Sequence, residues 1–296
     1  MTRLLPLVLL LLLAGCGAAT TSSHGRLRVV AAENSWGSIA AQLGGTRVQV
    51  TNLINSPAAD PHEYEPTPSN ARSMAEAQLA IVNGVGYDTW AQKLIDANPV
   101  DGRVVVTAAD LVGATSGDNP HLWYSPPAVS RMIDAVTASY KGLDPKHSAY
   151  YERRRTLFRA DALAGYQSLI ASIRNRFGGV PVGASESIFA PLARALGLRL
   201  ITPASFMSAV SEGSDPTGAS RSTVDRQLAG RQIKTWVYNS QNATPDVQRL
   251  TGEARANGIP VTSVTETLTP RDATFQAWQS TQLRALQRAL AQGSGR

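Results

Sequence analysis

Two histidines share an unusual setting in this chain of 296 residues, which contains only four histidines. His62 lies in DPHEYEPTP and His121 in NPHLWYSP, so each follows a proline and precedes an aromatic residue by two positions. Proline restricts its own φ and pushes the preceding residue out of the helical region, which predicts two rigid loops. Imidazole is the commonest neutral metal ligand, so metal binding is the chemistry that these loops could support. The alternative is two unrelated loop histidines, and we expect the other two, His24 and His147, to be solvated.

Carboxylates occupy comparable positions later in the chain. Glu186 follows the strand-like VPVGA, Glu266 follows VTSVT, and the segment SEGSDP contributes Glu212 and Asp215. Open α/β sheets bind ligands outside the carboxyl ends of their strands, where the two histidines are also expected. Two histidines and two carboxylates would close a shell around one cation, without the open position that a catalytic zinc requires. Taken singly, each carboxylate could equally be a solvated surface charge.

The elements that must position these side chains alternate between strands and helices. Short β-branched runs predict eight strands, at residues 26–33, 47–54, 79–84, 103–108, 180–184, 198–202, 235–239 and 259–265. Helical patterns separate them, which predicts an α/β fold with a mostly parallel, helix-covered sheet in each of two lobes. One helical pattern covers residues 145–177 and would approach about 50 Å at ~1.5 Å per residue. We interpret it as a strut joining the lobes, with a broken helix pair as the alternative, and we expect the ligand site between the lobes.

The N-terminus reads as a targeting signal. Arg3 precedes LLPLVLLLLLAGC, an apolar run too short to span a bilayer as a stable helix. Its end, LAGC, resembles the lipobox of bacterial lipoproteins, which implies acylation of Cys16, the only cysteine. The alternative is an ordinary signal peptide that happens to contain a cysteine.

These features predict five segments in the chain. They are a signal peptide at 1–15, a tether at 16–25, an N-terminal lobe at 26–144, a connecting helix at 145–177 and a C-terminal lobe at 178–296. We expect a lipid-anchored protein on the outer face of the cytoplasmic membrane.

Composition argues against other classes of protein. The formal net charge is +6, but no block of like charge or basic run interleaved with aromatics occurs, which disfavours nucleic acid as a partner. Neither an HExxH motif nor a G-x-S-x-G elbow is present, so we do not expect an enzyme.

Three segments, DPHEYEPTPSN, NPHLWYSP and SESIFAPLARALGL, resemble the metal-binding lipoprotein family, and the similarity runs over nearly the whole mature chain. These proteins are the solute-binding components of ABC importers for zinc, manganese or iron. The resemblance implies that His62 and His121 bind the metal and that Glu186 is a third ligand. The fourth ligand of the family is usually an aspartate after the last strand, and Glu266 is the matching position.

The chain departs from the family pattern at several places. Asn70, Asn119 and Ser125 stand at or near positions where the family often carries an acid. Glu266 is one methylene longer than the commoner aspartate, so Glu212 and Asp215 remain alternative ligands.

The resemblance implies capture of one divalent transition metal ion as cargo and its delivery, by a monomer, to an ABC permease in the membrane. A shell of nitrogen and oxygen ligands without thiolate disfavours Cu(I) and suits zinc, manganese or iron. The affinity of the site does not identify which of these three metals is the cargo. Many zinc-specific members of the family carry a histidine-rich loop, which residues 113–119 lack. We nevertheless regard zinc and manganese as equally favoured cargoes. The rival functions are a secreted zinc hydrolase, a surface adhesin and a binding protein for a small organic ligand.

Overall fold

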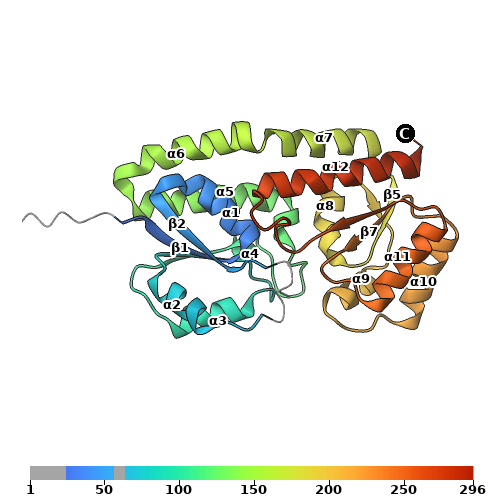
Figure 1. The fold of residues 1–296 in the computed structure, drawn as a ribbon, viewed down its shortest axis with the longest axis horizontal. Helices are drawn as coiled ribbons and strands as arrows, with labels where there is room; N and C mark the ends of the chain where they lie inside the picture. The colour runs from blue at the N-terminus through green and yellow to red at the C-terminus, as the bar shows by residue number, and fades with distance from the viewer. Residues whose placement is uncertain (1–24, 57–63, 296) are drawn as a thin grey trace, which may run out of the picture.

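Two parallel β-sheets form the centres of two lobes in the computed structural model, which describes residues 25–56 and 64–295 (Figure 1). The strand orders are β2-β1-β3-β4 and β6-β5-β7-β8. The strands are β1 (Leu27–Glu33), β2 (Val48–Ile54), β3 (Leu79–Val82), β4 (Val104–Thr107), β5 (Pro181–Ala184), β6 (Arg199–Leu200), β7 (Trp236–Asn239) and β8 (Val261–Val264). The predicted two-lobed α/β fold is therefore confirmed, with all eight strands where the β-branched runs placed them.

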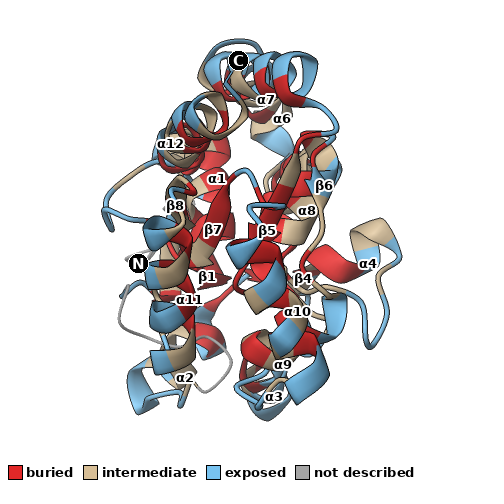
Figure 2. Ribbon diagram, turned by 90° about the vertical axis from the view of Figure 1, so that its right-hand side faces the viewer, coloured by how far each residue is buried: buried red, intermediate tan, exposed pale blue. Residues whose placement is uncertain are grey.

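Helices cover both faces of each sheet, so the strands are enclosed (Figure 2). They are α1 (Asn34–Gly44), α2 (Pro68–Glu76), α3 (Thr89–Ala97), α4 (Ala108–Val112), α5 (Pro126–Leu143), α6 (Ser148–Leu157), α7 (Ala164–Phe177), α8 (Ala190–Ala195), α9 (Ala204–Ser211), α10 (Gly218–Ala229), α11 (Pro245–Ala256) and α12 (Phe275–Ser294). The sequence reasoning did not predict α4 or α9. Both are short, so they carry too little apolar periodicity to be recognised.

The central strands are apolar because they are buried on both faces. In β1 all residues except Arg28 are buried, and the strand pairs with β2 and β3 at once, Val29 lying opposite both Val50 and Leu79. The parallel register brings the carboxyl ends of the strands to one edge of each sheet, where the candidate site residues follow them.

The expected connecting helix is interrupted. A 3₁₀ turn at Pro145–His147 precedes α6, and a π-helical turn at Phe158–Ala162 separates α6 from α7. The extra residue of a π turn shifts the helix face, and here Phe158 is buried whereas Leu157, just before it, is 54% exposed. Within the described residues, no helix is long and apolar enough to cross a membrane.

The C-terminal helix α12 ties the two lobes together. It packs along α7, and its first turn meets α1 of the N-terminal lobe, where the Phe275 backbone N–H donates to Ser38 Oγ at 2.9 Å (Figure 1). The side-chain amides of Gln42 and Gln276 also bond to each other at 3.1 Å. The lobes are thus joined by α7, by α12 and by polar contacts to α1.

Candidate metal centre

His121 is held in one orientation deep between the lobes. Its side chain is fully buried, and Nδ1 lies 2.9 Å from Asn119 Oδ1. The Asn119 amide is itself oriented, because its Nδ2 donates to the carbonyl of Ser187 in the C-terminal lobe at 2.7 Å. Asn119 Oδ1 can only accept, so Nδ1 carries a proton, and in the neutral imidazole Nε2 carries the lone pair. Nε2 lies 3.4 Å from Glu266 Oε1, and this pair of a ring nitrogen and a carboxylate oxygen suits a shared cation.

Aromatic rings fix the plane of this imidazole. The Trp123 ring packs edge-on against it with centroids 5.5 Å apart, and Tyr87 approaches from another side at 5.9 Å. Tyr87 and Trp123 also contact each other, at 4.9 Å. Trp123, the aromatic residue two positions after this histidine, therefore packs against the imidazole itself.

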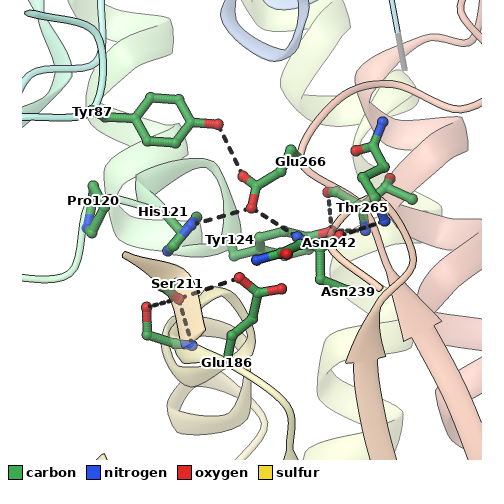
Figure 3. A network of polar contacts seen from close by, with 12 residues as sticks. Tyr87, Pro120, His121, Tyr124, Glu186, Ser211, Asn239, Asn242, Thr265 and Glu266 are labelled. Carbon is green, nitrogen blue, oxygen red and sulfur yellow. Dashed lines mark hydrogen bonds and ion pairs between the residues drawn. The ribbon is translucent and has the colours of Figure 1, made fainter. Parts of the chain in front are cut away.

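Glu266 lies just beyond β8, and both of its oxygens are hydrogen-bonded (Figure 3). Tyr87 donates to Oε2 at 2.9 Å, and Asn239 Nδ2 donates to Oε1 at 2.9 Å. Burial and the charge of Glu266 raise the pKa of Tyr87 well above its usual value, so the phenol remains a donor. The carboxylate is therefore preorganised by one residue from each lobe.

Glu186 is the second buried carboxylate, and it points toward the His121 and Glu266 pair (Figure 3). It follows β5, and its Oε2 accepts from Ser211 Oγ at 3.3 Å. Burial, and next the negative charge of Glu266, raise the pKa of Glu186 to about 8, against hydrogen bonds from side chains such as Asn239 that lower it. Two neighbouring buried carboxyls repel each other when both are ionised, and a cation between them would relieve that repulsion.

His62 lies outside the described residues, but the segment after it is anchored. The Tyr64 ring packs on Trp90 with centroids 4.7 Å apart, and its hydroxyl lies 2.9 Å from Asn70 Oδ1. Asn70 also accepts from the backbone N–H of Thr67 at 2.7 Å, and Thr67 caps α2. Thr67 is therefore the N-cap, and the helix begins at Pro68.

The two alternative ligands stay at the surface. Asp215 is fully exposed, with Oδ1 3.9 Å from Arg221. Glu212 is exposed on a hollow of about 400 Å³ between the lobes that Tyr87 and Ser211 also line. Neither is buried beside His121 as Glu186 and Glu266 are.

Residues 25–56 and 64–295 contain no group of three His, Cys, Asp or Glu side chains arranged to hold a metal ion by themselves. The structure brings together His121 and Glu266, with Glu186 facing them, and the remaining candidate ligand is His62.

Sequence reasoning missed the groups that orient these side chains, namely Tyr87, Asn239 and Ser211. Asn239 ends β7 and Tyr87 follows β3, so the rule on the carboxyl ends of strands could have pointed to both.

A second acidic pair, Glu33 and Asp88, lies in the N-terminal lobe. Asp88 accepts from the backbone N–H groups of Asn83 at 2.6 Å and Gly84 at 2.8 Å. Glu33 ends β1 and is 1% exposed, and burial together with Asp88 raises its pKa well above the usual value. The sequence reasoning did not single out either residue.

Two α/β lobes with donor side chains converging between them define a two-lobed ligand-binding protein. The chain belongs to the family described as zinc-uptake complex component A, periplasmic, whose model matches residues 29–289.

Curated relatives carry related names. The manganese-binding lipoprotein MntA of Halalkalibacterium halodurans is 30% identical over 49% of this chain and 50% of its own length. The manganese ABC transporter substrate-binding lipoprotein PsaA of Streptococcus pneumoniae is 24% identical over 64% of this chain and 65% of its own. The chain thus spans half to about two thirds of the length of these two relatives.

Solved structures share the fold. A manganese-bound form of a periplasmic metal-binding protein of candidatus liberibacter asiaticus, with an S38A substitution, superposes with a TM-score of 0.76. It is 20% identical, and the match covers 90% of this chain and all of that chain. A crystal structure of ZnuA gives a TM-score of 0.71 at 20% identity, with 90% of this chain and 99% of that chain covered.

Proposed function

We propose that this protein is a solute-binding protein that captures one divalent transition metal ion between its lobes and delivers it to an ABC permease. The observation that carries the proposal is the 3.4 Å approach of His121 Nε2, from the N-terminal lobe, to Glu266 Oε1, from the C-terminal lobe. Family membership and the names of the relatives, which refer to metal-binding and ABC substrate-binding lipoproteins, support it.

The proposed ligands are His62, His121, Glu186 and Glu266. Each lobe then supplies two of the four ligands, so metal binding depends on how closely the two lobes approach each other. Zinc and manganese remain the two leading cargoes, and iron is a third, since an iron-binding protein of Yersinia pestis is 29% identical over 54% of this chain. Imidazole and carboxylate ligands accommodate all three metals.

Binding and release both involve protons. Loading requires Glu186 as a carboxylate, and its pKa of about 8 means that the metal displaces a proton from this group near neutral pH. Release requires the permease to pull the shell apart, or protonation of the histidines. Because α7 and α12 pack along each other and join the lobes, we expect small adjustments of the loops rather than a wide hinge opening.

The same proposal includes the cellular setting. Acylation of Cys16 would anchor a monomer to the outer face of the cytoplasmic membrane through residues 16–25. Residues 26–144 and 178–296 would then be the two lobes, connected by 145–177. We propose that the protein binds metal without catalysing a reaction. We therefore expect no hydrolysis of esters or peptides, with or without a chelator, although the chelator should remove the metal.

Metal content tests the proposal directly. The chain lacking residues 1–16 would be purified without a histidine tag and measured by mass spectrometry, beside His62→Ala and Glu266→Ala. We expect about one equivalent of zinc or manganese in the native chain and loss of most of it in both variants. Retention in Glu266→Ala would assign the fourth ligand elsewhere. A native chain that stays empty in excess zinc and manganese would refute the proposal.

A further inference from the structure

A basic hollow lies at the amino ends of β1 and β2, at the opposite ends of the strands from the candidate metal centre. It has a volume of about 540 Å³ and is lined by Gly25, Arg26, Leu27, Thr46, Arg47, Gln78, Leu143, Asp144 and His147. Figure 1 shows this end of the N-terminal lobe pointing away from the C-terminal lobe. The hollow therefore belongs to a surface that the proposed metal chemistry does not use.

Neither arginine of this basic hollow has a carboxylate within salt-bridge distance among the described residues. The Arg26 guanidinium has a long contact of 3.4 Å to the amide oxygen of Gln49, and Arg47 lies over the Tyr150 ring, 5.3 Å from its centroid. Lys146 is exposed and directly precedes the lining residue His147 in the chain.

The one acidic residue in the lining is already engaged. Asp144 accepts from the Tyr151 hydroxyl at 2.9 Å and pairs with His147 Nδ1 at 2.7 Å. Asp144 also interacts electrostatically with Arg47. Arg26, Arg47 and Lys146 nevertheless outnumber this one carboxylate, and the excess of positive charge favours an anionic partner.

The proposed anchor at Cys16 would bring this surface to the membrane. Nine residues, 17–25, follow Cys16, and an extended chain spans at most about 3.6 Å per residue. Gly25, in the lining, is thus within about 30 Å of an acylated Cys16. Attraction of basic residues by anionic lipid falls off within a Debye length of ~8–10 Å, which is about a third of this reach. The tether therefore allows the hollow to touch the headgroups, and the charge of the hollow must hold it there.

We propose that the basic hollow is a docking surface for the anionic phospholipid headgroups of the membrane that carries the anchor. This inference rests on the proposed acylation of Cys16. Headgroup phosphates would contact Arg26, Arg47 and Lys146, and this end of the N-terminal lobe would rest on the bilayer. The metal centre, at the opposite ends of the strands, would stay clear of the lipid.

Vesicle binding tests the docking surface without the anchor. Both sheets and all the helices named above lie within residues 26–295, so the chain lacking residues 1–16 retains the fold. Its binding would be measured by co-sedimentation with vesicles of phosphatidylglycerol and phosphatidylcholine, or of phosphatidylcholine alone, at low and physiological salt. We expect binding only to the anionic vesicles, weakening as salt rises.

Matched charge variants locate the contact. Arg26→Gln with Arg47→Gln should weaken binding about 30-fold, since each basic residue near the surface contributes about fivefold. Arg284→Gln with Arg288→Gln removes the same charge from the exposed face of α12 and should change binding less than about threefold. Arg26→Gln with Lys146→Gln alters only exposed side chains and should weaken vesicle binding as much as Arg26→Gln with Arg47→Gln does. This second pair controls for any loss of stability that the Arg47 substitution causes.

Two results would overturn the proposal. One is that the unsubstituted chain lacking residues 1–16 does not bind anionic vesicles. The other is that the basic-hollow pair and the α12 pair weaken binding equally, which would mean that only the net charge matters. Metal content measured on the same variants keeps the proposed metal function separate. That content should be unchanged in all of them, and a chain that binds no metal but binds anionic vesicles would refute only the metal proposal.

Discussion

Replacing Glu186 by glutamine should change how the stability of the metal-free protein depends on pH. Burial and Glu266 raise the pKa of Glu186 from its usual 4.5 to about 8. A carboxyl whose folded pKa lies above its unfolded pKa favours folding below the unfolded value, and this stability is lost as pH rises toward the folded value. The native chain should therefore lose stability between about pH 4.5 and pH 8, and Glu186→Gln should not lose that part.

The size of the effect follows from the two pKa values. At about 1.4 kcal/mol per pH unit, the raised pKa corresponds to at most about 5 kcal/mol over the whole range, and to about 4 kcal/mol between pH 5 and pH 8.5. Glutamine also loses an acceptor toward a neighbour such as Ser211, which costs about 1 kcal/mol. That cost does not depend on pH, so it cancels when one variant is compared at two pH values.

Urea unfolding at pH 5 and pH 8.5, after removal of metal by a chelator, provides the measurement. The native chain should lose up to about 4 kcal/mol more between these pH values than Glu186→Gln does. Glu212→Gln is the matched control, because it removes an exposed carboxylate from the neighbouring hollow and should leave the native pH dependence intact. Equal pH dependence in the native chain and Glu186→Gln would refute the idea that Glu186 is a destabilised buried acid.

Three further predictions concern the polar groups around the site. His121→Ala should lower metal affinity more than about 100-fold in calorimetric titration, and unchanged affinity would remove His121 from the shell. Asn239→Ala frees Glu266 Oε1 from its donor and should weaken metal binding about 10- to 100-fold, an effect that the equally buried but distant Thr235→Ala should not reproduce. Glu33→Gln should raise the thermal midpoint of the metal-free chain at pH 8 more than at pH 5, because the pKa of Glu33 beside Asp88 is raised; an equal change at both pH values would contradict this.

Much of the fold could be predicted because its determinants are local. Runs such as VVAA in β1 are apolar enough for a strand buried on both faces, and alternation with helical patterns implies parallel pairing. The sequence left a broken helix pair open as an alternative, but the position of the break at Phe158–Ala162 could not be predicted, since nothing in that stretch is a helix breaker. The position of α12 against α1 is likewise a contact between segments more than two hundred residues apart.

The candidate site divides in the same way. The chain by itself determined which residue types follow which strands: the proline-held histidines, and Glu186 and Glu266 after strands of the second lobe. Only the tertiary structure decided that Glu266 reaches His121 across the lobes while Glu212 and Asp215 stay exposed. It also decided that Tyr87 and Asn239 hold Glu266 from opposite lobes. The reason is physical: a side chain's type and its place after a strand are local properties, whereas burial, a raised pKa and a 3.4 Å approach depend on how the two sheets face each other.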